Sequence, residues 1–357
     1  MISLELKAAL EQAKLNIETF HQQQLRTEAV VETMPGVRCW RKSVGIDKVG
    51  LYIPGGTAPL FSTLLMLAIP AKLAGCKEIV LCTPPQKDGT VHPAVLYAAS
   101  ITGVTKIIKA GGAQAIAAMA YGTHSVPKVY KIFGPGNQFV TAAKQLVQLD
   151  GIAIDMPAGP SEVCVLADAT CNPAFVAADL LSQAEHGADS QVLLVANSEK
   201  IVAEVELEIT KQLALLPRMD FAGKSLANSR AIVLANLDDA IDLVNAYAAE
   251  HLIISCENDE NIAEQISNAG SIFLGHYSPE SVGDYASGTN HTLPTNGYAR
   301  MYSGVSVDSF VKKITYQKLS EEGLQGISEI VKLMAAAEGL DAHANAVGIR
   351  LSPPWRG

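Results

Sequence analysis

The sequence contains no apolar run that could cross a membrane. A spanning helix needs about 20 consecutive apolar residues, and the longest apolar stretch, residues 64–74, is interrupted by Pro70 and Lys72. The first residues, MISLELKAALEQ, lack the basic start and the apolar core of a secretory signal. We therefore expect a cytoplasmic protein with no membrane partner.

The sequence also lacks clusters of lysine and arginine, and it lacks cysteines at metal-binding spacing. Its formal net charge is -9, and an acidic chain without a basic patch is not expected to bind nucleic acid. None of the six cysteines belongs to a C-x-x-C pair, and most of them lie in apolar segments. They predict reduced core thiols and argue against a thiolate metal site.

What the sequence does contain is an alternation of short apolar strands and helices. The first strands are expected at residues 49–53, 79–82, 107–108 and 129–133, with helices near 60–74, 93–101, 113–121 and 138–148. Further strands are expected at residues 163–166, 191–195, 231–234, 252–255 and 271–274, with a helix at 173–186. Such βαβ repetition is typical of a parallel sheet with helices on both faces. It predicts an α/β fold with two Rossmann-like but incomplete parallel-sheet lobes and a helical C-terminal extension.

The same alternation predicts the domain boundaries. One α/β domain covers residues 49–160. A second combines residues 161–304 with residues 1–48, which hold an N-terminal helix and a short β region. Residues 305–357 are expected to form a helical tail. With 357 residues and 48% hydrophobic content, the chain is long enough to bury the cores of two lobes.

Glycine-rich turns follow three strands of the first lobe. They are YIPGGTAP at residues 52–59, AGGAQAIAA at 110–118 and FGPGNQF at 133–139. Turns at the carboxyl ends of strands are where open α/β sheets bind ligands, and their backbone N–H groups suit a diphosphate. None of them is a complete G-x-G-x-x-G, so a nucleotide site and ordinary tight turns both remain possible interpretations.

The second lobe carries paired polar residues that can support chemistry. Gln183 and His186 stand three residues apart at the end of a predicted helix, so both can point to one place. Two interpretations of this pair stay open: it is half of a metal site, or it is the ordinary polar end of a helix. Glu250 and His251 offer two proton acceptors at one end of a strand, or merely a histidine that caps a helix.

A Gly-rich segment at residues 283–291, predicted to be non-helical, contains Asp284 and His291. His343, read singly, is a surface residue near the C-terminus. Together with Gln183 and His186, Asp284 and His343 would provide two nitrogen and two oxygen ligands, a set that suits zinc or a neighbouring divalent metal.

Seven segments, in this order, resemble the histidinol dehydrogenase family. They are VGLYIPGG, GGAQAIAA, FGPGN, IDMPAGPSEV, DLLSQAEHG, EHLII and GDYASGTNHTLPT. The resemblance extends from about residue 2 to about residue 350. It implies oxidation of L-histidinol to L-histidine, the last step of histidine biosynthesis, through a bound aldehyde with two NAD used in succession. It also implies a zinc-dependent homodimer.

The resemblance further implies roles for individual residues. The implied zinc ligands are Gln183, His186, Asp284 and His343, the last donated to the partner subunit's site. The implied NAD contacts are Tyr52, Gln114 and Asn137. The implied catalytic pair is Glu250 and His251. The implied substrate contacts are Ser161, His251, His291 and Glu338, together with the zinc ligands.

By the same resemblance, residues 49–160 form the NAD-side domain, residues 1–48 and 161–304 the zinc and substrate domain, and residues 305–357 a dimerisation tail. Family members have several dozen more residues before the helix that begins near Ser3. Because of this short start, a non-catalytic relative stays open as an alternative. A second alternative is a zinc hydrolase in which Glu250, Gln183, His186 and Asp284 activate water without NAD.

Overall fold

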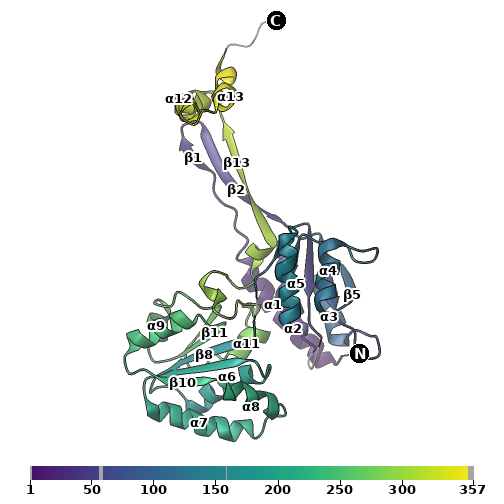
Figure 1. Cartoon of the computed structure of the whole chain (residues 1–357), viewed down its shortest axis with the longest axis vertical. Coiled ribbons are helices and arrows are strands. Elements are labelled where there is room, and N and C mark those ends of the chain that lie inside the picture. The colour runs from purple at the N-terminus through teal and green to yellow at the C-terminus, as the bar shows by residue number, and fades with distance from the viewer. Residues whose placement is uncertain (1, 56–58, 158, 353–357) are drawn as a thin grey trace. The chain divides into compact units, whose positions relative to one another are not determined.

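The computed structural model of the chain describes residues 2–55, 59–157 and 159–352 (Figure 1). Its contacts divide the chain into two compact units. One consists of Met1–Leu25 with Ile46–Phe310, and the other of Arg26–Gly45 with Val311–Gly357. The first unit contains both predicted lobes.

The first lobe is built on a five-stranded parallel sheet with the strand order β5-β4-β3-β6-β7. The strands are β3 (Lys48–Tyr52), β4 (Glu78–Thr83), β5 (Lys106–Lys109), β6 (Lys131–Phe133) and β7 (Ala153–Ile154). The helices between them are α2 (Phe61–Leu73), α3 (Pro93–Thr102), α4 (Gly112–Tyr121) and α5 (Gln138–Leu149). Apolar clusters on the two faces of the sheet form its core.

The second lobe repeats this plan with the strand order β10-β9-β8-β11-β12. The strands are β8 (Glu162–Ala167), β9 (Gln191–Ala196), β10 (Arg230–Val233), β11 (His251–Ser255) and β12 (Ser271–Leu274). The helices are α6 (Pro173–Ala184), α7 (Glu199–Leu213), α8 (Met219–Ala227), α9 (Leu237–Tyr247), α10 (Asp259–Ala263) and α11 (Glu280–Tyr285). The short 3₁₀ turns Tyr298–Arg300 and Val307–Phe310 follow.

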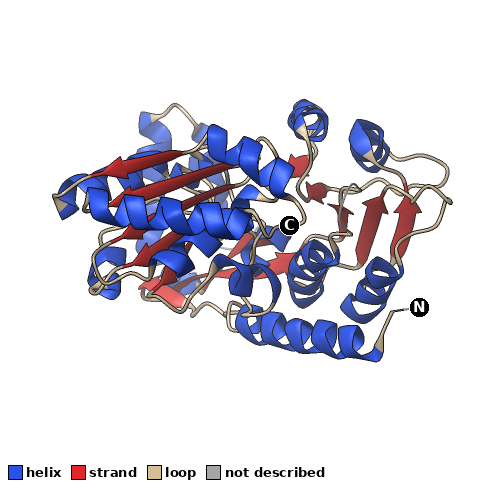
Figure 2. Cartoon of the chain, turned by 90° about the horizontal axis from the view of Figure 1, so that it is seen from below, coloured by secondary structure: helices blue, strands red, loops and turns tan. Residues whose placement is uncertain are grey.

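Both lobes therefore place their first strand in the middle of the sheet, and the strand order 3-2-1-4-5 matches the Rossmann order without its sixth strand. Helices cover both faces of each sheet (Figure 2). The near-continuous apolar strands fit this double burial, because a parallel sheet covered on both sides has no polar face. The prediction of two Rossmann-like lobes is confirmed.

The N-terminal helix α1 (Leu4–Gln22) packs mainly on the first lobe. Residues 62–71 of α2 are all buried, so α2 needs a cover on the side that faces away from the sheet. Leu10, Ala13 and Ile17 of α1 supply it. Residues 1–48 were expected to pack on the second lobe, and α1 differs from this prediction. Helix α1 also contacts the second lobe, where Asn16 Nδ2 donates to the carbonyl of Ala286 at 2.7 Å.

The second unit contains an antiparallel three-stranded sheet of β1 (Val31–Met34), β2 (Val37–Gly45) and β13 (Val311–Leu319). Two helices, α12 (Glu321–Ala337) and α13 (Asp341–Leu351), complete it. The predicted β region is confirmed as β1 and β2. Strand β13 is a correction, because this segment was expected to be helical. Its β-branched and aromatic residues Ile314, Thr315 and Tyr316 favour a strand, and nine residues of β13 pair with β2.

Among the described residues, no helix combines the length and the hydropathy that a bilayer span requires. All six cysteines are free thiols, as predicted.

Candidate active site

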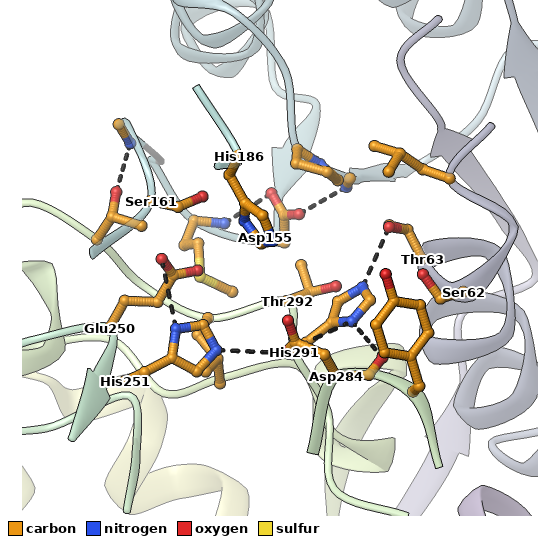
Figure 3. Close-up of a pocket in the computed structure, with 18 of the residues that line it drawn as sticks. Ser62, Thr63, Asp155, Ser161, His186, Glu250, His251, Asp284, His291 and Thr292 are labelled. Atoms are coloured by element: carbon orange, nitrogen blue, oxygen red, sulfur yellow. Dashed lines mark hydrogen bonds and ion pairs between the residues drawn. The ribbon is translucent and has the colours of Figure 1, made fainter. Parts of the chain in front are cut away.

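A cavity of about 180 Å³ lies in the first unit, where the two lobes face each other. The first lobe contributes residues that follow β6 and β7, including Gly134 and Asp155, and the N-terminal turn of α2. The second lobe contributes residues that precede β8 and β11 and the loops around α11. Six predicted site residues line this cavity: Ser161, His186, Glu250, His251, Asp284 and His291 (Figure 3).

Glu250 and His251 enter the cavity at the start of β11. Helix α9 ends with Ala248 in the left-handed conformation (φ 57°), which turns the chain directly into the strand. Glu250 Oε2 accepts a hydrogen bond from the N–H of Glu162 at 3.0 Å and lies 3.7 Å from His251 Nδ1. His251 Nδ1 is 3.3 Å from the carbonyl oxygen of Glu162. A carbonyl can only accept, so this contact places the proton on Nδ1 and leaves Nε2 to face Asp284.

The electrostatics of this pair follow from burial among carboxylates. Burial raises the pKa of Glu250 to about 7. Burial opposes protonation of His251, but the negative charges of Glu250, Asp284 and Glu280 outweigh it and raise the pKa of His251 to about 10. A cation bound beside these carboxylates would offset their charge and favour the neutral imidazole.

Gln183 and His186 lie at the end of α6 and meet as their spacing predicted. Gln183 Nε2 is 3.4 Å from His186 Nδ1. The other amide atom, Gln183 Oε1, is buried without a hydrogen-bond partner, and so is Asp284 Oδ1. Burying polar atoms without partners is costly, so two such oxygen atoms in one site call for a ligand.

A divalent cation is the ligand that these atoms fit. One ligand atom each from His186, Glu280 and Asp284 lie within 4.8 Å of one another. His186 is exposed, whereas the two carboxylates are buried, so an ion has access from solvent. The set contains one imidazole nitrogen and two carboxylate oxygen atoms, which suits zinc and neighbouring divalent metals.

His291 is held between two elements far apart in the sequence. Its Nδ1 donates to the carbonyl of Asp284 at 2.8 Å, and its Nε2 lies 3.1 Å from Thr63 Oγ1 on α2 (Figure 3). Burial lowers the pKa of His291 and favours the neutral ring. Since Nδ1 then carries the proton, the hydroxyl of Thr63 donates to Nε2.

The three predicted NAD residues lie at the carboxyl edge of the first-lobe sheet, where they end or follow β3, β5 and β6. Tyr52 ends β3, and its hydroxyl accepts from the N–H of Gly112 at 3.0 Å. Gln114 is exposed in the first turn of α4. Asn137 caps α5 and accepts hydrogen bonds from Phe139 N and Val140 N. This edge is where open α/β sheets bind nucleotides, and the NAD contacts stay a prediction.

A buried ion pair fixes the turn that follows β6. Lys144 Nζ lies 2.5 Å from Asp155 Oδ1, and the two side chains are 4% and 1% exposed. Lys144 also donates to the carbonyl of Gly134 at 2.8 Å, and Asp155 Oδ2 accepts from the Gly134 N–H at 2.7 Å. The pair therefore clamps the Gly134 turn from both sides.

Replacing Lys144 with methionine is expected to lower the free energy of unfolding by about 3 to 5 kcal/mol, because Asp155 would remain buried without its cation. Urea denaturation of the parent and the variant measures the difference. Lys211→Met, which breaks the exposed pair of Lys211 with Glu208, should cost no more than about 1 kcal/mol. Equal costs for the two variants would contradict the role of the buried pair.

Two predicted residues belong to the second unit. Glu338 caps the C-terminal end of α12, and His343 lies in the first turn of α13. Both side chains are exposed.

Two residues of the site, Thr63 and Glu280, were not predicted from the sequence. Thr63 lies inside an apolar helix, and no sequence signal marks it. Glu280 stands four residues before Asp284, and both lie in α11. The prediction had been that residues 283–291 are non-helical. The helix corrects that prediction, and the i, i+4 spacing of two acids was the signal that could have found Glu280.

The chain is similar over nearly its whole length to proteins of one family. The family model described as histidinol dehydrogenase matches residues 1–351. A histidinol dehydrogenase from Bacteroides thetaiotaomicron is 66% identical over 352 residues, 99% of this chain and 82% of the relative. One from Mannheimia succiniciproducens is 57% identical over 98% of this chain and 81% of its own length. The crystal structure of histidinol dehydrogenase from Elizabethkingia anophelis, 58% identical, has a TM-score of 0.96 and covers 98% of this chain and 81% of that chain.

Proposed function

The chain belongs to the histidinol dehydrogenase family, and from this premise we propose that it oxidises L-histidinol to L-histidine, with NAD and one zinc ion per subunit. This reaction would be the last step of histidine biosynthesis and would pass through bound histidinaldehyde. The observation that carries the proposal is the cavity in which a buried acid–histidine pair faces a set of unpartnered metal-ligand atoms.

We assign the metal site to Gln183, His186 and Asp284, with His343 supplied by a second copy of the chain. The buried Oε1 of Gln183 and Oδ1 of Asp284 support the assignment, because both lack a hydrogen-bond partner beside the imidazole of His186. When bound, zinc would orient L-histidinol by holding the imidazole and the amine of this substrate.

His251 is assigned as the base that removes the proton of the alcohol. Its Nδ1–H points to the carbonyl of Glu162, so Nε2 is the atom that accepts the proton once a bound cation offsets the neighbouring carboxylates. NAD, when bound, would supply the acceptor for the hydride that leaves the carbon bearing the hydroxyl group. A second NAD would supply the acceptor for the hydride that leaves in the oxidation of the aldehyde. Glu250 is assigned to deprotonate the water that attacks the aldehyde carbon, and a pKa of about 7 suits a base at neutral pH.

The remaining substrate contacts are assigned to Ser161 and His291 in the cavity and to Glu338 from the partner. His291 is well suited to this task, because Thr63 and the Asp284 carbonyl hold both of its nitrogens. Tyr52, Gln114 and Asn137 are assigned to NAD, so residues 49–160 form the NAD-side domain. Residues 161–304 form the domain of zinc and substrate, without α1, which packs on the first lobe.

We further propose that the second unit forms the interface of a homodimer. Among its described residues, only two apolar side chains, Val37 and Ala335, are buried. Nine larger apolar side chains are exposed: Val30, Val31, Ile314, Tyr316, Ile330, Leu333, Met334, Leu340 and Ile349. A unit with so little core gains its stability from a partner, and exposed apolar surface of this kind marks an interaction site. A second copy in this position would bring in Glu338 and His343.

The reaction is proposed to take place in the cytoplasm, where free thiols persist. All six cysteines are unpaired, in keeping with a reducing compartment.

Purified protein is expected to form two NADH for each L-histidinol consumed, because the alcohol loses four electrons on its way to the carboxylate. Absorbance of NADH at saturating NAD measures the ratio. Activity should disappear after chelation and return with zinc. A zinc-loaded dimer that forms no NADH would contradict the proposal and favour a hydrolase, which would be tested by assaying the same protein without NAD.

A further inference from the structure

Glu280 is a buried acid for which the proposed reaction has so far no use. It is the first residue of α11, and its side chain is 1% exposed. Its Oε2 is completely buried and has no hydrogen-bond partner. A carboxylate in this situation is costly to keep in a folded protein unless a proton or a cation compensates it.

The surroundings of Glu280 add negative charge rather than remove it. Asp284 lies one helical turn further along α11, and Asp179 on α6 contributes to the same field. His251 offsets part of this charge, but Glu250 and Asp284 compete for it. The protein itself therefore leaves Glu280 short of a positive partner.

The position of Glu280 shows where such a partner would sit. Its ligand atom lies within 4.8 Å of ligand atoms of both His186 and Asp284, which are already assigned to zinc. Gln183 and His186 are neutral ligands, so Asp284 alone would leave one positive charge of a buried dication unbalanced. A second carboxylate at this distance makes the site neutral overall.

We propose that Glu280 is a positioning residue of the zinc site, supplying the second negative charge that sets its affinity for a divalent cation. The inference rests on the zinc site of the proposed function. Rigid placement on α11 gives Glu280 and Asp284 a fixed separation, so the two charges are arranged before the ion arrives. Glu280 thereby favours a dication over a monovalent ion.

The test is zinc affinity, measured at one pH by competition with a chromophoric chelator on the purified full-length protein. Glu280→Gln keeps the size and removes the charge, and it should weaken zinc binding by about 10- to 100-fold, the usual effect of losing a partner around a metal site. Glu280→Asp keeps the charge and should bind more tightly than Glu280→Gln. Glu260→Gln, at an exposed acid in the short helix α10, should leave the affinity unchanged.

The outcomes separate this inference from the function on which it rests. Parent protein that binds no zinc would overturn both the zinc site and the role of Glu280. Parent protein that binds one ion per subunit, with Glu280→Gln binding equally well, would overturn only the role of Glu280. Circular dichroism checks that the variants are folded. If Glu280→Gln does not fold, the zinc affinities of Glu280→Asp and Glu260→Gln are compared. Weaker binding by Glu280→Asp would support the role of Glu280, and equal binding would overturn it.

Discussion

The His251→Asn variant is expected to oxidise L-histidinol about 100- to 10,000-fold more slowly than the parent, the usual contribution of a general base. Asparagine can still donate to the carbonyl of Glu162 from a similar position, but it has no lone pair with the basicity of imidazole Nε2. The loss should therefore fall on kcat, while the zinc content and the fold are kept.

Stopped-flow or steady-state formation of NADH measures this loss, and metal analysis of the same sample measures zinc. His276→Asn is the matched control, since His276 contacts Ser255 and Thr170 outside the cavity. It should turn over like the parent. Full activity in His251→Asn would show that another group removes the proton, whereas loss of zinc in this variant would mean that His251 supports the metal instead.

The two lobes could be predicted from the sequence because their signal is local. Buried parallel strands have to be apolar on both faces, and this leaves short apolar runs such as β8 and β9 that any reading of the chain detects. Strand β13 was not predicted, because almost all of its residues are exposed and no face of the strand shows a hydrophobic pattern. Its identity depends on pairing with β2, which lies far away in the sequence.

The residues of the site also differ in whether a local sequence pattern predicts them. Gln183 and His186 could be paired from the sequence, because helical geometry alone brings them together. Asp284 and His251 meet them only through the packing of α6, α11 and β11, which no local pattern encodes. Thr63 is the extreme case, since a hydroxyl inside the apolar helix α2 gains a role solely from its contact with His291. The resemblance to a family supplied the distant ligands, and it did not supply Glu280.

The His186→Ala variant is expected to lose zinc and turnover together. His186 is the only nitrogen ligand that the described part of the first unit offers in the assigned set, and its removal leaves oxygen atoms, which bind zinc less well than imidazole. Since changes around a metal site already cost about 10- to 100-fold in affinity, loss of a direct ligand should exceed about 100-fold. The cavity itself should persist, because the exposed His186 contributes little to the core.

Zinc content after dialysis and NADH formation with and without added zinc test this expectation. His124→Ala provides the control, because His124 is exposed and does not line the cavity. Partial recovery of activity at high zinc would show that the ligand sets affinity and that the catalytic pair Glu250 and His251 is intact. A His186→Ala protein with parental zinc content would contradict the metal assignment, and the unpartnered oxygen atoms of Gln183 and Asp284 would then need a different ligand.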